Sequence, residues 1–120
     1  MYRKLFTGLM SLVFLSGCYY DSEEELYGTC NTSNVSYSQN ITNILQNNLC
    51  MNCHGNPPSN AAPFSLVTYA DVKAQVDAGR LIGAINHIQG FAAMPKEGPK
   101  MSQCDIDKVE AWVASGAPQN

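Results

Sequence analysis

The sequence predicts an all-α fold, and three observations support this prediction. Apolar residues recur at helical spacing in several short segments, and these segments begin at a capping residue or end at Gly. No stretch alternates convincingly between apolar and polar residues over the length of a strand. Pro and Gly separate the periodic segments. A chain of 120 residues has room for one small domain and a tail, which excludes a multidomain enzyme with a large interior cleft.

The chain begins with a segment that is typical of export signals. Arg3 and Lys4 precede an apolar run from Leu5 to Leu15. Eleven residues are too few to cross a hydrocarbon core, which needs about 20. We therefore interpret the run as the apolar region of a secretory signal.

The signal ends in Leu15-Ser16-Gly17-Cys18, which resembles the lipobox of bacterial lipoproteins. This resemblance implies that Cys18 is diacylated on sulfur, becomes the mature N-terminus and ties the protein to a membrane facing the periplasm or the outer surface. The alternative is an ordinary secretory signal in which Cys18 is incidental. We divide the chain into a signal peptide (1–18), a polar acidic tether (19–34) and a domain (35–120).

The charge of the chain argues against nucleic acid as a partner. Seven basic and ten acidic residues give a formal charge of -3, and no basic cluster follows Arg3 and Lys4. Removal of the signal leaves five basic and ten acidic residues, a formal charge of -5. Part of this acidity lies in the run from Asp21 to Glu25, which lacks apolar periodicity and is typical of a solvated stalk.

Four helices are expected in the domain. Ser36 and Gln39 have the spacing of a capping box, and the helix that they begin leads directly into Cys50. Thr68 begins a second helix that ends at Gly79, and a short third helix follows. Ser102 begins the last helix, which ends at Gly116. The residues expected to face inward are Ile41, Ile44, Leu45, Leu49, Tyr69, Val72, Val76, Leu81, Ile82, Ile85, Ile106, Val109, Trp112 and Val113.

Cys50-Met51-Asn52-Cys53-His54 is the most informative motif of the chain. C-x-x-C-H is the attachment signature of a c-type haem, and at this composition it is expected by chance only about 0.003 times. Positions i, i+3 and i+4 share one face of a helix. Two thiols on one turn can therefore add to the two vinyl groups of a haem while the imidazole of His54 reaches the iron.

The same residue types also occur in two other kinds of site, a structural zinc site and a redox-active thiol pair. A structural zinc site needs four nitrogen or sulfur ligands, which Cys30 or Cys104 together with His87 could complete. A thioredoxin-like redox pair would lie in a βαβ unit, which the surrounding sequence does not show.

Cys30 and Cys104 remain after one Cys is assigned to lipid and two to haem. A disulfide is their simplest use in an exported protein. In the loop-entropy model, a disulfide that closes a loop of this length stabilises the folded protein by roughly 4 kcal/mol. The alternative is two free buried thiols.

The haem motif, the helix pattern and the Met94-Pro95 pair together resemble the small monohaem cytochromes c of mitochondria and bacteria, over residues 35–120. The resemblance implies a cytochrome c-like fold of three to five short helices around one covalently bound haem c, in which the first and last helices cross. The first helix lacks the Gly and aromatic residues of many relatives, and the Cys30–Cys104 bridge is outside the common family pattern.

The resemblance also implies the ligands of the iron. His54 takes one axial position, and Met94 takes the other, because it lies before a Pro in a loop between helices, as the thioether ligand of the family does. His87 is the alternative to Met94, whereas Met101 is expected to fill the core. The backbone carbonyl of Pro63 is expected to accept a hydrogen bond from the second ring nitrogen of His54.

Several apolar residues are expected either to line the haem pocket or to belong to the core: Phe64, Leu66, Tyr69, Leu81, Ile85, Ile88 and Phe91. The resemblance implies an electron carrier that exchanges single electrons with redox partner proteins and needs no catalytic residue. The alternatives are a five-coordinate haem enzyme or gas sensor, such as a small peroxidase, and a haem subunit of a larger respiratory complex.

Overall fold

The computed structural model describes residues 28–120. This part of the chain is helical and contains no strand, so the all-α prediction is confirmed for it. Its helices are η1 (Tyr37–Ile41), α2 (Thr42–Asn47), η2 (Cys50–Asn52), α3 (Tyr69–Asp77), α4 (Arg80–Ile85) and α5 (Gln103–Ala114). None of the helices in residues 28–120 has the length and apolar character needed to cross a membrane. The signal peptide, Cys18 and residues 19–27 of the tether lie outside the described residues.

The first helix begins as expected at Ser36, but its first turn is wider than an α-helical turn. Ser36 Oγ accepts a hydrogen bond from the backbone N–H of Gln39 at 3.2 Å. The backbone N–H of Ser36 donates to Asn40 Oδ1 at 2.8 Å, so Asn40 takes the part that a capping box gives to Gln39. The N–H of Ile41 reaches the Ser36 carbonyl at 3.1 Å, which closes a π-helical turn.

The expected continuous helix from Ser36 into Cys50 is wrong at its C-terminal end. Helix α2 ends at Asn47, and Leu49 has a left-handed backbone with φ of 57°. This reversal turns the Leu49 side chain away from the apolar stripe of the helix, and the side chain is 64% exposed. The other three members of the stripe, Ile41, Ile44 and Leu45, are buried as predicted.

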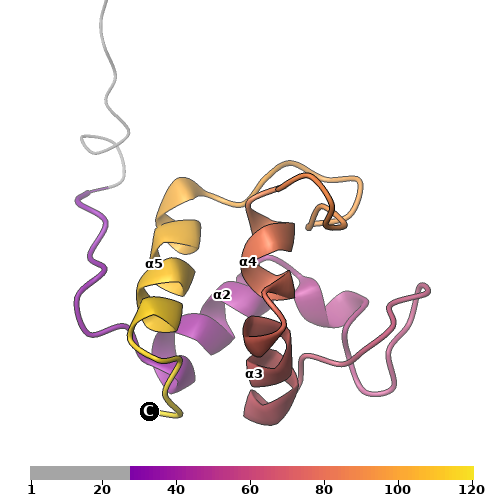
Figure 1. The fold of residues 1–120 in the computed structure, drawn as a ribbon, viewed down its shortest axis with the longest axis horizontal. Helices are drawn as coiled ribbons and strands as arrows, with labels where there is room; N and C mark the ends of the chain where they lie inside the picture. Colours follow the sequence, from indigo (N-terminus) through magenta and orange to yellow (C-terminus); the bar gives the residue numbers. More distant parts are fainter. Residues whose placement is uncertain (1–27) are drawn as a thin grey trace, which may run out of the picture.

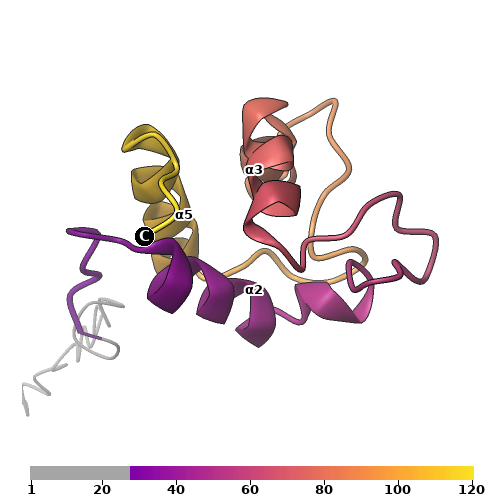
Figure 2. The same ribbon diagram turned by 90° about the horizontal axis from the view of Figure 1, so that it is seen from below.

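The later helices begin and end near the predicted positions. Thr68 and Asp71 form a complete capping box at the start of α3, and Gly79 separates α3 from α4 with φ of 69°. Ser102 Oγ accepts from the backbone N–H of Asp105 at 3.1 Å and caps α5. Helix α3 packs against α4, and α5 packs against both η1 and α4 (Figures 1 and 2).

Three aromatic rings join these elements in the core. Tyr37 of η1 lies 5.1 Å from Tyr69 of α3 in an edge-to-face arrangement and 5.8 Å from Trp112 of α5, between ring centroids. Trp112 is fully buried, and its Nε1–H donates to the Pro118 carbonyl at 2.9 Å. Tyr69 Oη donates to the Ala117 carbonyl at 2.8 Å. The segment after α5 therefore completes the polar contacts of the aromatic core.

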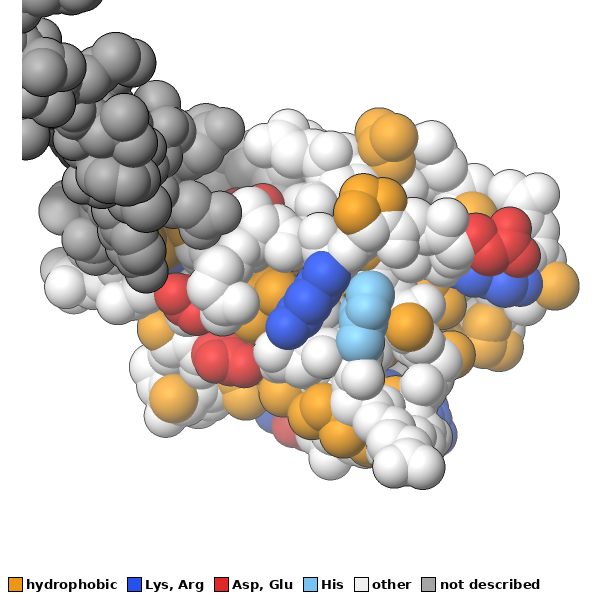
Figure 3. Space-filling model, turned by 90° about the horizontal axis from the view of Figure 1, so that it is seen from above, with side chains coloured by type: hydrophobic (Ala, Val, Ile, Leu, Met, Phe, Trp, Pro, Cys, Tyr) orange, Lys and Arg blue, Asp and Glu red, His pale blue; other side chains and the backbone are white. Residues whose placement is uncertain are grey.

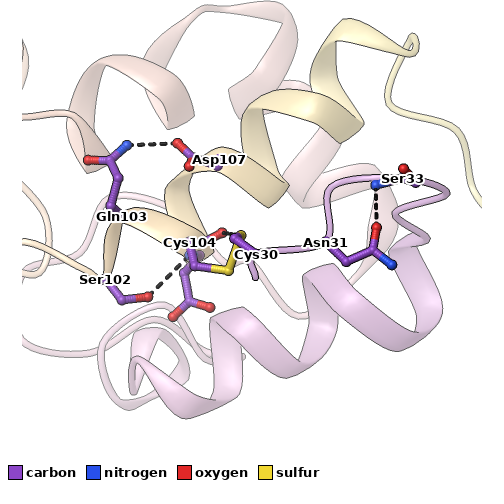
Figure 4. The surroundings of a disulfide bond; sticks show 8 residues. Cys30, Asn31, Ser33, Ser102, Gln103, Cys104 and Asp107 are labelled. Atoms are coloured by element: carbon purple, nitrogen blue, oxygen red, sulfur yellow. Dashed lines mark hydrogen bonds between the residues drawn. A yellow bond between two sulfur atoms is a disulfide. The ribbon is translucent and has the colours of Figure 1, made fainter. Parts of the chain in front are cut away.

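A disulfide joins the segment before η1 to the first turn of α5 (Figure 4). The sulfur atoms of Cys30 and Cys104 are 2.09 Å apart in this bond. Its two ends are 74 residues apart in sequence, so it closes a loop that contains the helices from η1 to α4. The segment before the first helix is thus joined covalently to the last helix, and the aromatic core joins η1 to α5.

Candidate functional site

Cys50, Cys53 and His54 lie together on one short helical turn. The carbonyl of Cys50 accepts hydrogen bonds from the backbone N–H of Cys53 at 3.3 Å and of His54 at 2.8 Å. Both thiols are free and half-buried. The expected turn is therefore present, although the left-handed Leu49 separates it from α2.

The imidazole of His54 is fixed in position and in tautomer. Its Nδ1 lies 2.9 Å from the carbonyl oxygen of Phe64, and its ring stacks on the Phe64 ring with centroids 4.7 Å apart. A carbonyl only accepts hydrogen bonds, so Nδ1 carries a proton, and in the neutral ring the lone pair is then on Nε2. This is the state that a metal-ligating Nε2 requires.

His54 is buried, with only 6% of its surface exposed. The Nδ1 side of its ring is bonded to the Phe64 carbonyl, whereas Nε2 forms no hydrogen bond with residues 28–120. Nε2 is therefore the ring atom that has no partner in the described part of the chain.

The hydrogen-bond acceptor for His54 differs from the expected one. The carbonyl of Phe64, not that of Pro63, accepts from Nδ1. The N–H of Leu66 also donates to the His54 carbonyl at 2.8 Å, so Phe64 and Leu66 face His54 together. The hydrogen bonds of His54 thus involve Phe64 and Leu66 and not Pro63, which lies in the loop before them.

Two polar residues that the sequence analysis did not single out fasten the following loop to the motif. The backbone N–H of Ser59 donates to the Cys53 carbonyl at 2.8 Å, and Ser59 Oγ donates to the Asn52 carbonyl at 2.7 Å. Asn60 Nδ2 lies 3.6 Å from Cys53 Sγ. Ser and Asn are so common in loops that their types alone do not signal these contacts.

The environment of the two thiols argues against the alternative uses of the motif. Burial raises the pKa of the Cys50 thiol, whereas a reactive redox pair depends on a lowered pKa. A zinc site would need Cys30 or Cys104, but these are bonded to each other. No group of three His, Cys, Asp or Glu side chains in residues 28–120 is arranged to hold a metal ion.

The two candidates for the second axial ligand, Met94 and His87, are brought together by the loop after α4. His87 Nε2 lies 3.0 Å from the carbonyl oxygen of Met94. Met94 is half-buried and His87 is exposed. Met101, the residue assigned to core filling, is buried in the hydrophobic core with 8% exposure.

The residues expected to line the haem pocket fall into two groups. Leu66, Leu81 and Ile85 are buried, and Phe64 and Tyr69 are half-buried. Ile88 and Phe91 instead expose 48% and 40% of their surface, and Leu49 and Val67 are also exposed. Figure 3 shows hydrophobic side chains in several patches on one face of the molecule, around a histidine and a basic side chain.

The loops that carry these exposed residues lie at the same end of the molecule. The segments that follow η2 and α4 both extend beyond α4, on the side away from α5 (Figures 1 and 2). This end combines two free thiols, an imidazole lone pair, a thioether and exposed apolar side chains. The two thiols and the imidazole are the groups that attachment of a c-type haem requires, and the thioether fits as a second ligand of its iron.

Comparison of the chain with protein-family models, with curated proteins and with solved structures found no match.

Proposed function

We propose that this chain is a small c-type cytochrome that carries single electrons. The observation that carries the proposal is the turn from Cys50 to His54, in which two free thiols share one turn with an imidazole whose Nδ1–H is fixed and whose Nε2 forms no hydrogen bond with residues 28–120. Contact between the first and last helical segments, η1 and α5, agrees with the cytochrome c-like arrangement that the family resemblance implies.

Four residues would hold the haem c. Cys50 and Cys53 would attach it through thioether bonds, and His54 and Met94 would ligate the iron. Bound haem supplies an iron that alternates between the ferrous and ferric states. The Phe64 carbonyl keeps His54 oriented and raises its basicity. The soft thioether of Met94, as a ligand, would favour the ferrous state and so raise the potential.

The protein's remaining contribution is an apolar surface at the attachment site. Ile88 and Phe91 are exposed in the loop that leads to Met94, and Val67 is exposed after the His54 loop. Apolar side chains around the iron would exclude water and lower the local dielectric constant, and both of these influence the reduction potential of the iron. No residue acts as an acid, base or nucleophile in this function.

The proposal places the domain outside the cytoplasm on a membrane. Acylated Cys18 would anchor it, and the acidic tether would hold it away from the bilayer surface. Its partners would be a donor and an acceptor protein in the same compartment. Cys18→Ala in the full chain is expected to release the protein from the membrane fraction without loss of haem.

The test is to produce the full chain in a bacterium with a c-type haem maturation system and to examine the mature protein. A pyridine haemochrome spectrum should show haem bound through two thioethers, and a redox titration should follow one reversible electron. The long-wavelength charge-transfer band of thioether-to-ferric-iron ligation should disappear in Met94→Ala. The matched control Met101→Leu changes a buried core methionine and should keep the band.

Two other results would overturn the proposal. A high-spin iron that binds carbon monoxide readily in the unchanged protein would indicate a five-coordinate enzyme or sensor. Purification only with other subunits would indicate a haem subunit of a larger complex.

A further inference from the structure

The loop that carries Met94 is folded back onto the end of α4. The carbonyl of Ala84 accepts hydrogen bonds from the backbone N–H of His87 at 3.2 Å and of Met94 at 3.0 Å. The ring of Phe91 lies directly on Gly83, where a Cβ atom would clash with it. The loop is therefore attached to the helix by its backbone and by one aromatic ring.

His87 adds a side-chain contact to this loop. Its backbone is left-handed, with φ of 56°, and its side chain is exposed. Nε2 lies 3.0 Å from the Met94 carbonyl oxygen, and because a carbonyl only accepts, Nε2–H donates this bond. The exposed ring is thus held across seven residues of loop.

Met94 is consequently held on both sides of its Cα atom. Ala84 holds its N–H and His87 holds its C=O. The peptide that joins Met94 to Pro95 has no N–H, because Pro lacks one, so it can be held only through the Met94 carbonyl. The hydrogen bond from His87 is therefore the contact that orients the peptide after Met94.

We infer that His87 is a positioning residue that holds Met94 in place as the second axial ligand. The inference rests on the proposed function. A neutral thioether is a weak ligand, so its occupancy of the iron depends on how well the protein holds it in advance. The sequence offers His87 as the alternative ligand to Met94. In this arrangement, His87 instead holds Met94 in place.

Two variants separate the hydrogen bond from the unusual backbone of His87. Asn tolerates the left-handed conformation, but in His87→Asn the side chain is too short to reach the Met94 carbonyl. In His87→Gln the terminal NH₂ extends about as far as the imidazole Nε2 and restores a donor. Both variants leave the thiols, His54 and Met94 unchanged.

The experiment compares the mature wild-type protein with both variants at one pH. It measures the charge-transfer band, the rate at which cyanide displaces the ligand from ferric iron, and hydrogen exchange of the Met94 amide. In His87→Asn we expect a weaker band, with cyanide binding and amide exchange about five- to tenfold faster, the factor expected for one lost hydrogen bond. His87→Gln should remain close to wild type.

The outcomes distinguish the inference from the proposed function. Unchanged rates in His87→Asn, or equal changes in both variants, would overturn the positioning role while leaving the cytochrome assignment intact. A wild-type protein that has a strong ligand field but no thioether band, together with a band that appears in His87→Asn, would show that His87 itself ligates the iron. That result would also overturn the positioning role. A wild-type protein without haem would overturn the proposed function and, with it, this role.

Discussion

The two ends of the domain are built on different principles. At one end, which we call the aromatic end, the ring of Tyr37 packs against those of Tyr69 and Trp112, and α5, which carries Trp112, is joined to the segment before η1 by the Cys30–Cys104 disulfide. At the other, which we call the motif end (residues 49–67 and 86–95), loops predominate and Leu49, Val67, Ile88 and Phe91 are exposed.

This difference shows which part of the fold the polypeptide completes alone. The aromatic end buries its large side chains and bonds the indole N–H of Trp112 and the hydroxyl of Tyr69 to backbone carbonyls. The motif end leaves apolar side chains in contact with solvent and holds its loops mainly by hydrogen bonds to backbone carbonyls. We infer that the aromatic end provides stability and that the motif end is completed by the group it binds.

The largest effect on stability should come from the centre of the aromatic end. Trp112→Ala removes a fully buried side chain and should lower the free energy of unfolding by about 3–5 kcal/mol. Phe91→Ala, a truncation at the motif end where the ring is 40% exposed, should cost less than half as much in haem-free protein. Chemical denaturation followed by circular dichroism measures both. If both variants lost the same free energy of unfolding, the claim that the aromatic end provides the stability would be contradicted.

Removal of the disulfide should have the next largest effect. Cys30→Ser with Cys104→Ser should lower the free energy of unfolding by about 2–4 kcal/mol because the unfolded chain gains freedom. Haem attachment at Cys50 and Cys53 should persist, as judged by the haem content of folded protein. Loss of attachment in a variant that still folds would show that the two ends are not independent.

A smaller effect is expected at the junction of the two ends, where the capping box begins α3. Thr68→Ala removes the side chain that accepts from the Asp71 N–H and should cost about 1 kcal/mol. Thr68→Ser retains the hydroxyl and is the matched control. The thermal unfolding midpoints of the two variants should therefore differ, and coinciding midpoints would contradict the capping role.

The smallest effect is expected in how the stability of the fold depends on pH through Asp71, at the same capping box. The N–H of Thr68, followed by the hydroxyls of Thr68 and Ser65, lowers the pKa of Asp71 below its ordinary value of 3.8. Because the folded pKa is the lower one, the carboxylate stabilises the fold above pH 3.8, and this contribution is lost as the pH falls through the folded pKa. We expect the free energy of unfolding of Asp71→Asn, measured from about pH 2 to about pH 6, to lack the pH-dependent contribution of this carboxylate. If the free energies of wild type and variant changed with pH in parallel, the lowered pKa of Asp71 would be contradicted.

The features predicted from sequence are those set by neighbouring residues. Thr68 and Ser102 begin helices because their hydroxyls bond N–H groups three residues later, and this spacing is visible in the chain. The thiols and imidazole of the motif share a turn for the same reason. Both signals lie within one helical turn, so no knowledge of the tertiary fold is needed to find them.

The errors concern features that the tertiary fold decides. The left-handed backbone at Leu49 has no Gly or Asn to announce it, so the apolar stripe was extended one turn too far. Phe64 rather than Pro63 bonds His54 because the path of the loop after the motif decides which carbonyl reaches the ring. The bond from His87 to Met94 depends in the same way on the folding of the loop.

The central claim is most directly tested by the intact mass of the mature protein. When the chain is produced with the c-type maturation system, we expect a mass larger than that of the processed polypeptide by one haem, retained under denaturing conditions. The variant with Cys50→Ala and Cys53→Ala should show the polypeptide mass alone. A wild-type protein without the added haem after correct export would contradict the account.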